Sequence, residues 1–227
     1  MIAPPAGYGE KPMELTLRYR GQLAANGRPS DKHKIRKQLH GQLDEFWRQD
    51  TRLSEIYKNL KQLQIPKRSR DHFEVDRPLP DPTFFYWRWP LCGYDFIPLV
   101  THVHELYCYL NIRIYRKLGR GGILFTGGDL DNKLKTFFDA LRVPQAPEEL
   151  PNEEDAPNMD DNSANWPHMF CLLDDDRAIT KLTIQSFKLL TNVPVDCDRP
   201  ENYVELDADV TILPATPLLG SLNILYP

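Results

Sequence analysis

Two groups of carboxylates have the spacing most relevant to chemistry in this sequence. The first is the segment Asp129-Leu130-Asp131-Asn132, which is followed by Lys135. In an extended segment Asp129 and Asp131 point the same way, and Lys135 lies one helical turn beyond Asp131. Hard oxygen ligands of this kind suit Mg²⁺ or Mn²⁺, and a nearby lysine can neutralise a phosphate. The segment therefore predicts metal-assisted hydrolysis of a phosphodiester.

The second group is the triplet Asp174-Asp175-Asp176, which precedes an expected strand. A triplet at the start of a neighbouring strand can add a carboxylate to the same ion. Each group also has an ordinary structural explanation. The first group can cap a helix and complement its dipole, and the triplet can form a solvated turn. Either group alone is more often structural, whereas the two together favour a metal site.

The hydropathy pattern predicts the elements that position these carboxylates. Apolar and polar residues alternate, as they do in half-buried strands, in several segments. The expected strands cover residues 14–20, 107–117, 179–189 and 203–213. A first helix is expected over residues 31–63, where Pro66 follows. A second, short helix has one buried face, formed by Leu134, Phe137, Phe138 and Leu141, and ends at Pro144.

The resulting order is β-α-β-α-β-β, which predicts an α+β fold class with a mixed β-sheet. We expect a single domain over residues 1–227, with insertions at about 66–106 and 145–168 and a C-terminal tail at 214–227. The first insertion is rich in proline and aromatic residues, and we expect it to pack on the core. The second is acidic and is expected to form a mobile loop.

Charge is distributed unevenly along the chain, whose formal net charge is −4. Residues 145–168 hold seven acids and no lysine or arginine, which leaves 28 basic and 25 acidic residues elsewhere. Residues 1–70 hold 15 basic and 7 acidic residues. The basic residues gather in two clusters, Lys32, Lys34, Arg36 and Lys37, then Lys67, Arg68 and Arg70. Such clusters are usually solvated surface, but they are also the groups that bind DNA phosphates, and composition alone leaves both open.

Several classes of protein are not expected from this sequence. No run of about 18 apolar residues is present, so we expect no membrane span and no membrane partner. The first eleven residues lack a basic region followed by an apolar run, so we expect no secretory signal. The 4 cysteines form no CxxC pair, which favours a reducing compartment and argues against zinc.

The two carboxylate groups resemble the motif of one known family. The segment Asp129-Leu130-Asp131-Asn132, with Lys135 and then Asp139-Ala140-Leu141, precedes the pair Asp175-Asp176 and an alternating strand. This combination resembles the RusA-like Holliday junction resolvases, over roughly residues 109–140 and 170–212. The resemblance implies a RusA-like fold.

The resemblance also implies a site and a substrate. In that family three aspartates hold Mg²⁺, with Mn²⁺ as a possible substitute, and activate a water. They match Asp129, Asp131 and Asp176, while the lysine that assists at the phosphate matches Lys135. Asn132 and Asp175 match supporting positions. The implied protein is a homodimeric endonuclease that binds four-way DNA junctions and makes paired nicks. We expect it to be cytoplasmic, and bacterial or phage-encoded.

The chain departs from the family in its two insertions. The acidic segment 145–168 would repel DNA, so we expect it to fold away or to contact a protein partner. Two alternatives to the resolvase hypothesis remain open. One is a non-catalytic binding module for nucleic acid or protein on the same fold. The other is a nuclease for a different structure, such as a DNA flap or RNA.

Overall fold

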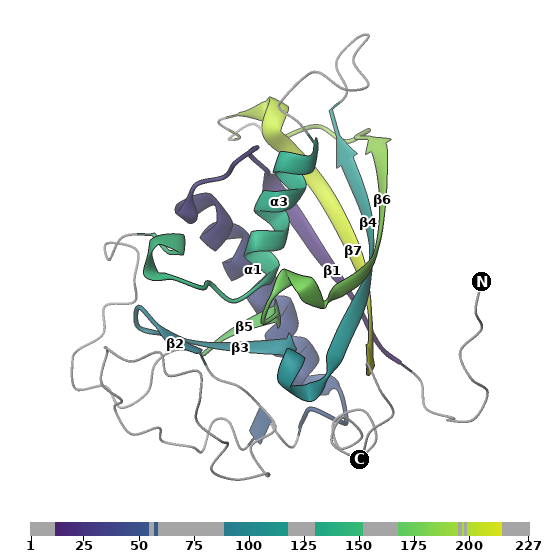
Figure 1. Ribbon diagram of the computed structural model, residues 1–227. Coiled ribbons are helices and arrows are strands. Elements are labelled where there is room, and N and C mark those ends of the chain that lie inside the picture. The colour runs from purple at the N-terminus through teal and green to yellow at the C-terminus, as the bar shows by residue number, and fades with distance from the viewer. Residues whose placement is uncertain are drawn as a thin grey trace.

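Two helices pack on one face of a sheet, and a second, smaller sheet lies at one end of that layer (Figure 1). The computed structural model describes residues 12–54, 57–58, 89–117, 130–151, 168–194, 197 and 199–214. Within these residues the fold is mixed α+β, as the sequence predicts.

The larger sheet has the strand order β1-β7-β4-β6. Its strands are β1 Met13–Gln22, β4 Leu106–Arg116, β6 Ile179–Lys188 and β7 Tyr203–Pro214. The smaller sheet has the order β2-β3-β5, with β2 Trp89–Leu91, β3 Tyr94–Val100 and β5 His168–Leu173. The helices whose bounds fall within the described residues are α1 Pro29–Gln49 and α3 Leu130–Leu141. Short 3-10 turns are η1 His102–His104, η2 Pro147–Glu149, η4 Asp176–Ala178 and η5 Pro200–Asn202.

The strands of the larger sheet confirm the four predicted alternating segments. Strand β7 pairs antiparallel with both β1 and β4, and β6 pairs parallel with β4. In this register Ile112 lies opposite Ala208 on one side and Ile184 on the other. Alternate residues of β4 and β7 are buried under the helices. The remaining residues of these strands form an open face that points away from the helices.

Helix α1 is shorter than the pattern predicts. It begins after Arg28, whose backbone N–H donates to the Asp31 carboxylate at 3.0 Å, and it ends at Gln49 rather than near residue 63. Asp50 leaves the helical conformation, with ψ of 125°. Its carboxylate accepts from the backbone N–H of Arg52 at 2.9 Å and pairs with the Arg52 guanidinium at 2.6 Å. This local bonding competes with the helix and ends it.

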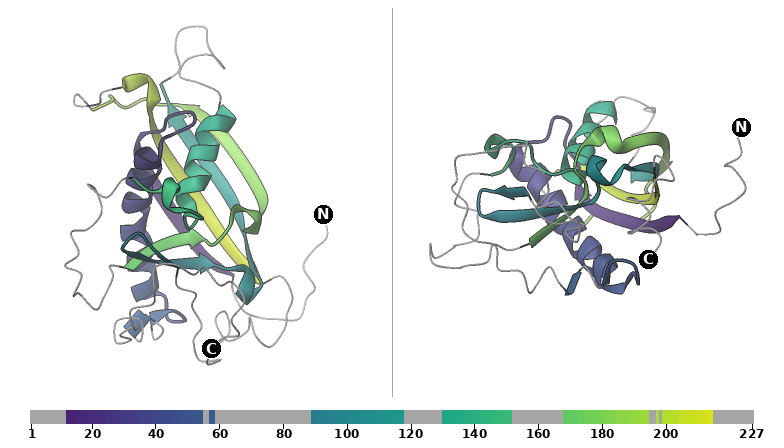
Figure 2. Two further views of the ribbon diagram at one scale, coloured as in Figure 1. Left: turned by 60° about the vertical axis from the view of Figure 1, so that its left-hand side comes forward. Right: turned by 60° about the horizontal axis from the view of Figure 1, so that its bottom comes forward.

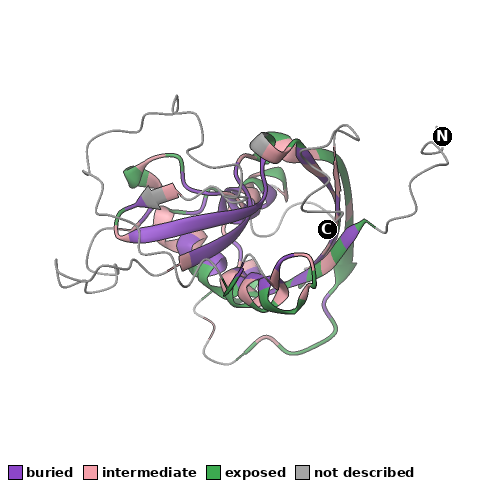
Figure 3. Cartoon of the chain, turned by 90° about the horizontal axis from the view of Figure 1, so that it is seen from below, coloured by how far each residue is buried: buried purple, intermediate pink, exposed green. Residues whose placement is uncertain are grey.

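The predicted order of helices and strands is wrong in one respect, because it lacks the smaller sheet. The sequence pattern predicts an irregular insertion that includes residues 89–100 and no strand over residues 168–173, yet these segments form β2, β3 and β5. Every residue of β3 is buried, so its sequence has no alternation (Figure 3). A strand covered on both faces reads as a continuous apolar run. The expectation that this region packs on the core is confirmed for residues 94–100.

A buried histidine joins α1 to the smaller sheet. His33 is buried, and its Nε2 lies 3.3 Å from the hydroxyl oxygen of Tyr94. Burial lowers the pKa of His33 from 6.5 to about 4, and the charges of Arg36 and Lys37 act in the same direction. Between these two values the unfolded chain binds a proton that the folded chain does not.

Acidification is therefore expected to destabilise the protein through His33. The stability that neutral His33 contributes is fully present above the pKa that this side chain has in the unfolded chain. It is lost as the pH falls towards the pKa of about 4 that His33 has in the folded protein. The complete loss corresponds to about 3 kcal/mol. Urea unfolding at a series of pH values, for the wild type and for His33→Gln, measures it. The wild type should lose more stability on acidification than the variant, and parallel curves would contradict the assignment.

Candidate functional site

The first turns of α3 present the predicted motif residues. Asp131 and Lys135 are both exposed, and they lie one turn apart on the same side of the helix. Asp131 Oδ1 accepts a hydrogen bond from the backbone N–H of Asn132 at 2.8 Å. Asp129 lies outside the described residues. The structure thus makes one motif carboxylate and the motif lysine available to a ligand on one face of α3.

The loop before α1 holds this end of α3 in place. The backbone N–H of Gly27 donates to Thr136 Oγ1 at 2.8 Å, and Thr136 Oγ1 also donates to the carbonyl of Asn132 at 3.2 Å. A Cβ at position 27 would lie 2.5 Å from Thr136 Cγ2, so a side chain there would force the loop and the helix apart. Close backbone approach at Gly27 therefore fixes where Lys135 stands relative to α1.

A small cavity of about 150 Å³ lies between α1 and α3 beside Lys135. Lys32 enters it from α1, and its Nζ forms an ion pair with Asp139 Oδ2 at 2.7 Å. Asp139 also pairs with Arg142 at 3.3 Å. The positive charge of Lys32 is therefore largely compensated. Lys135, which has no ion pair among the described residues, is the lysine of this cavity that can meet an anion.

The acidic triplet divides into a buried residue and two more accessible ones. Asp174 is buried, and its Oδ2 accepts from the backbone N–H of His102 at 2.8 Å and also contacts His102 Nδ1. Its Oδ1 accepts from the backbone N–H of Asp175 at 2.7 Å. The backbone N–H of Asp174 donates to the carbonyl of Val100 at 3.0 Å. Asp174 therefore holds the turn after β5 against η1, the turn that precedes β4.

Removing this carboxylate is expected to destabilise the turn. Asp174→Ala leaves the backbone N–H groups of His102 and Asp175 without their acceptor, and hydrogen bonds to charged groups contribute about 1.5–3 kcal/mol each. We expect a loss of at least about 2 kcal/mol in the free energy of unfolding, measured in urea. Asp174→Asn, which keeps one acceptor oxygen, should lose less. Equal stability of Asp174→Ala and the wild type would contradict the role.

Asp175 and Asp176 complete the triplet. Asp175 begins η4, and its Oδ1 accepts from the backbone N–H of Arg177 at 2.9 Å. Burial acts to raise the pKa of Asp175, but its hydrogen bond and charge interaction with Arg177, together with Asp176 and Arg142, outweigh burial and lower it. Asp176 is exposed. The lowered pKa keeps Asp175 in its carboxylate form, and Asp176 is the member of the triplet that is open to solvent at the start of β6.

The structure does not bring Asp131 and Asp176 together. The backbone N–H of Val143 donates to the carbonyl of Leu173 at 2.9 Å, which ties the end of β5 to the residues just after α3. The charges of Asp176 and Arg142 also interact. At the rise of an α-helix, Asp131 and Arg142 are separated by about 16 Å along the helix axis. Asp131 thus lies in the first turn of α3, whereas the turn η4, which begins at Asp176, lies beside the other end of this helix (Figure 2). Among the described residues, no three His, Cys, Asp or Glu side chains lie close enough to hold a metal ion.

The basic residues of α1 are of two kinds, exposed and buried. Lys34 and Lys37 are exposed, as a phosphate-binding surface requires. The prediction that Arg36 contacts DNA is wrong, because its side chain is buried. Its Nη2 donates to the carbonyl of Asp139 at 2.9 Å, and its guanidinium lies 5.9 Å from the centre of the Phe96 ring. Arg36 thus supplies a hydrogen-bond donor to a backbone carbonyl near the end of α3. The predicted cluster Lys67, Arg68 and Arg70 lies outside the described residues.

The beginning of the acidic segment is packed rather than loose. We expected a mobile loop from residue 145, but η2 forms there and Leu150 is buried. Glu149 pairs with Arg142 through both carboxylate oxygens, at 3.2 and 3.0 Å. The stretch of described residues ends at 151, so the acids from Glu153 to Asp161 lie outside it. The sequence does not predict this pair, because its two partners lie in different predicted elements.

Comparisons with family models, with curated proteins and with solved structures gave no match. None of the helices in the described ranges is long and apolar enough to cross a membrane. The fold and the site thus define an α+β protein with an exposed aspartate and an exposed lysine on one face of α3. Its function must be argued from those residues and from the motif.

Proposed function

We propose that this chain is a divalent-metal-dependent endonuclease that cuts branched DNA, with a RusA-like fold. The observation that carries the proposal is the joint exposure of Asp131 and Lys135 on successive turns of α3. These residues belong to the motif from Asp129 to Lys135, and the strand before the motif and the strand after the acidic pair are both present, as β4 and β6.

The described residues fit a Mg²⁺ ion in part. Asp131 offers an exposed carboxylate, and Asp129 is its motif neighbour outside the described residues. Asp176 lies at the far end of α3, whereas Mg²⁺ requires ligands at about 2.0–2.1 Å. Within one chain, Asp131 and Asp176 therefore do not share an ion in this conformation. When bound, such an ion supplies an activated water and stabilises negative charge on the phosphate.

The surrounding residues support binding of a phosphate backbone. Lys135 is positioned to contact a phosphate beside Asp131, because its charge is uncompensated in the cavity between α1 and α3. Lys34 and Lys37 extend the positive charge along the exposed side of α1. A homodimer, which the resemblance implies, would present two copies of this surface to the arms of a junction. Two such copies would allow both strands of a branch to be cut while the DNA stays bound.

A cleavage assay tests the proposal directly. A four-way junction labelled on one strand is incubated with the protein in Mg²⁺, in Mn²⁺ and in EDTA. The proposal predicts nicks in either metal and none in EDTA. Cleavage that persists in EDTA would point to a different chemistry.

One observation favours the alternative of a non-catalytic binding module, namely the separation of Asp131 and Asp176 along α3. A binding module retains the DNA contacts of Lys34, Lys37 and Lys135 without turnover. Junction binding by a folded protein, with no cleavage in either metal, would establish that alternative and exclude the nuclease.

A further inference from the structure

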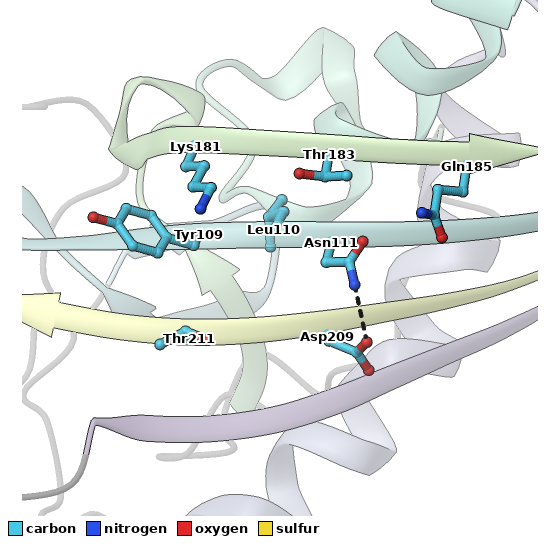
Figure 4. A pocket seen from close by; sticks show the side chains of 8 residues that line it. All are labelled: Tyr109, Leu110, Asn111, Lys181, Thr183, Gln185, Asp209 and Thr211. Atoms are coloured by element: carbon cyan, nitrogen blue, oxygen red, sulfur yellow. Dashed lines mark hydrogen bonds between the residues drawn. The ribbon is translucent and has the colours of Figure 1, made fainter. Parts of the chain in front are cut away.

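The open face of the larger sheet carries a hollow that the proposed nuclease site does not use (Figure 4). Its volume of about 440 Å³ falls within the range of roughly 300–1,000 Å³ that is common for ligand sites. The residues that line it belong to β4, β6 and β7, and α1 and α3 cover the other face of the sheet (Figure 1). The lining residues are Tyr109, Leu110, Asn111, Lys181, Thr183, Gln185, Asp209 and Thr211.

Aromatic rings flank the hollow along β4. Tyr107 and Tyr109 lie on the open face two residues apart, with ring centres separated by 5.7 Å. Further along the same face, Tyr115 stacks on Phe187 of β6, with ring centres 5.3 Å apart and planes inclined by 25°. Phe187 is 41% exposed. Aromatic rings spaced along an exposed strand are a surface on which successive unpaired bases can stack.

The charges of the hollow favour an anion. The carboxylate of Asp209 is already neutralised by Arg113, whose Nη2 lies 3.1 Å from Oδ1. The same carboxylate accepts from Thr16 Oγ1 at 2.9 Å and from Asn111 Nδ2 at 3.5 Å. Lys181 Nζ lies 5.3 Å from the centre of the Tyr109 ring. Lys181 is a cation with no paired carboxylate among the described residues, and its ammonium group lies over one face of the Tyr109 ring.

The remaining lining groups suit the edge of a base. Asn111, Thr183 and Gln185 place two amides and a hydroxyl around the floor of the hollow. Such groups both donate and accept hydrogen bonds, as recognition of an unpaired base requires. Double-stranded DNA does not offer this ligand, because its bases are already stacked and paired. An aromatic face, an adjacent cation and amide groups together match one nucleotide of a single strand.

We propose that this hollow binds an unpaired nucleotide of single-stranded DNA, with the base stacked on Tyr109 and its phosphate at Lys181. The proposal rests on the proposed function, because it makes the hollow a second contact for branched DNA. It lies on the opposite face of the sheet from α3 and Lys135. Single-stranded flaps on branched DNA supply the unpaired nucleotides that it binds.

Fluorescence anisotropy with a labelled oligothymidylate, in EDTA and at several salt concentrations, tests the site apart from any cleavage. Tyr109→Leu should weaken binding by about tenfold, the scale of losing one stacked base. Lys181→Gln should reduce the slope of log K against log salt by about 0.7. Lys188→Gln is the matched control, since it removes the same charge from the same strand on the other face. Circular dichroism confirms that each variant is folded.

The outcomes separate this proposal from the proposed function. Loss of single-strand binding in Tyr109→Leu and Lys181→Gln, with Lys188→Gln unchanged, supports the hollow even if the protein cuts no DNA. Unchanged binding by Tyr109→Leu overturns it, whatever the cleavage assay shows. Equal losses for Lys181→Gln and Lys188→Gln, or equal losses for duplex and single strand, also overturn it, because they indicate phosphate contact without a base site. Competition by free thymidine monophosphate distinguishes a mononucleotide site from one that requires a strand.

Discussion

Replacing Asp131 with asparagine is expected to lower the rate of junction cleavage by about 10²–10³-fold, the scale of removing one group that stabilises charge in a transition state. The amide keeps the shape of the carboxylate and can still accept the hydrogen bond from the backbone N–H of Asn132. Because Asp131 is exposed, the fold should be unaffected. The affinity for DNA should change little, since removing a negative charge does not weaken attraction to phosphate.

Rates of single-turnover cleavage and dissociation constants, measured for the same variant, check this expectation. Glu148→Gln is a matched control, because it removes one exposed carboxylate on η2 without touching the motif. The control should cut like the wild type. If Asp131→Asn lost binding and cleavage equally, or lost neither, Asp131 would not be part of a catalytic site.

The second large effect is expected in stability, at Phe170 of β5. This ring is buried and stacks on the rings of His40 and Tyr57 at 5.8 Å, with Trp47 at 5.5 Å. The backbone N–H of Phe170 also donates to His40 Nδ1 at 2.9 Å. Phe170→Ala should therefore cost about 3–5 kcal/mol in the free energy of unfolding.

Urea denaturation measures this loss, and Phe170→Leu is the control because it fills more of the cavity. The leucine variant should lose clearly less than the alanine variant. Strand β5 leads directly into Asp174, so a loosened β5 should also shift the acidic turn. A loss below about 1 kcal/mol for Phe170→Ala would show that the aromatic cluster does not join α1 to β5.

The parts of the fold that alternate in hydropathy could be predicted from sequence. Strands β1, β4 and β7 each have one buried face and one open face, and β6 lies beside β4 at the edge of the sheet. Helix α3 also has one buried face. The smaller sheet could not be found this way, because β3 is buried on both faces and therefore shows no period. The end of α1 was missed because it depends on Asp50, whose carboxylate binds Arg52 rather than continuing the helix.

The candidate site was predictable only where its residues are neighbours in sequence. The spacing of Asp131 and Lys135 correctly places them on one face of a helix. The position of Asp176 depends on the path of the chain through β5, which no local pattern encodes. Arg36 was misassigned because a basic cluster does not reveal which of its members faces the core. Asp174 was similarly hidden within a triplet that looks uniformly solvated.

The most direct test of the central claim is the position of the cuts. A four-way junction and a linear duplex of matched sequence, each labelled in turn on every strand, are incubated with the wild-type protein in Mg²⁺. The account predicts paired, symmetrically placed nicks near the centre of the junction and little cleavage of the duplex. No cleavage of the junction by the folded protein, or equal and scattered cleavage of both substrates, would contradict it.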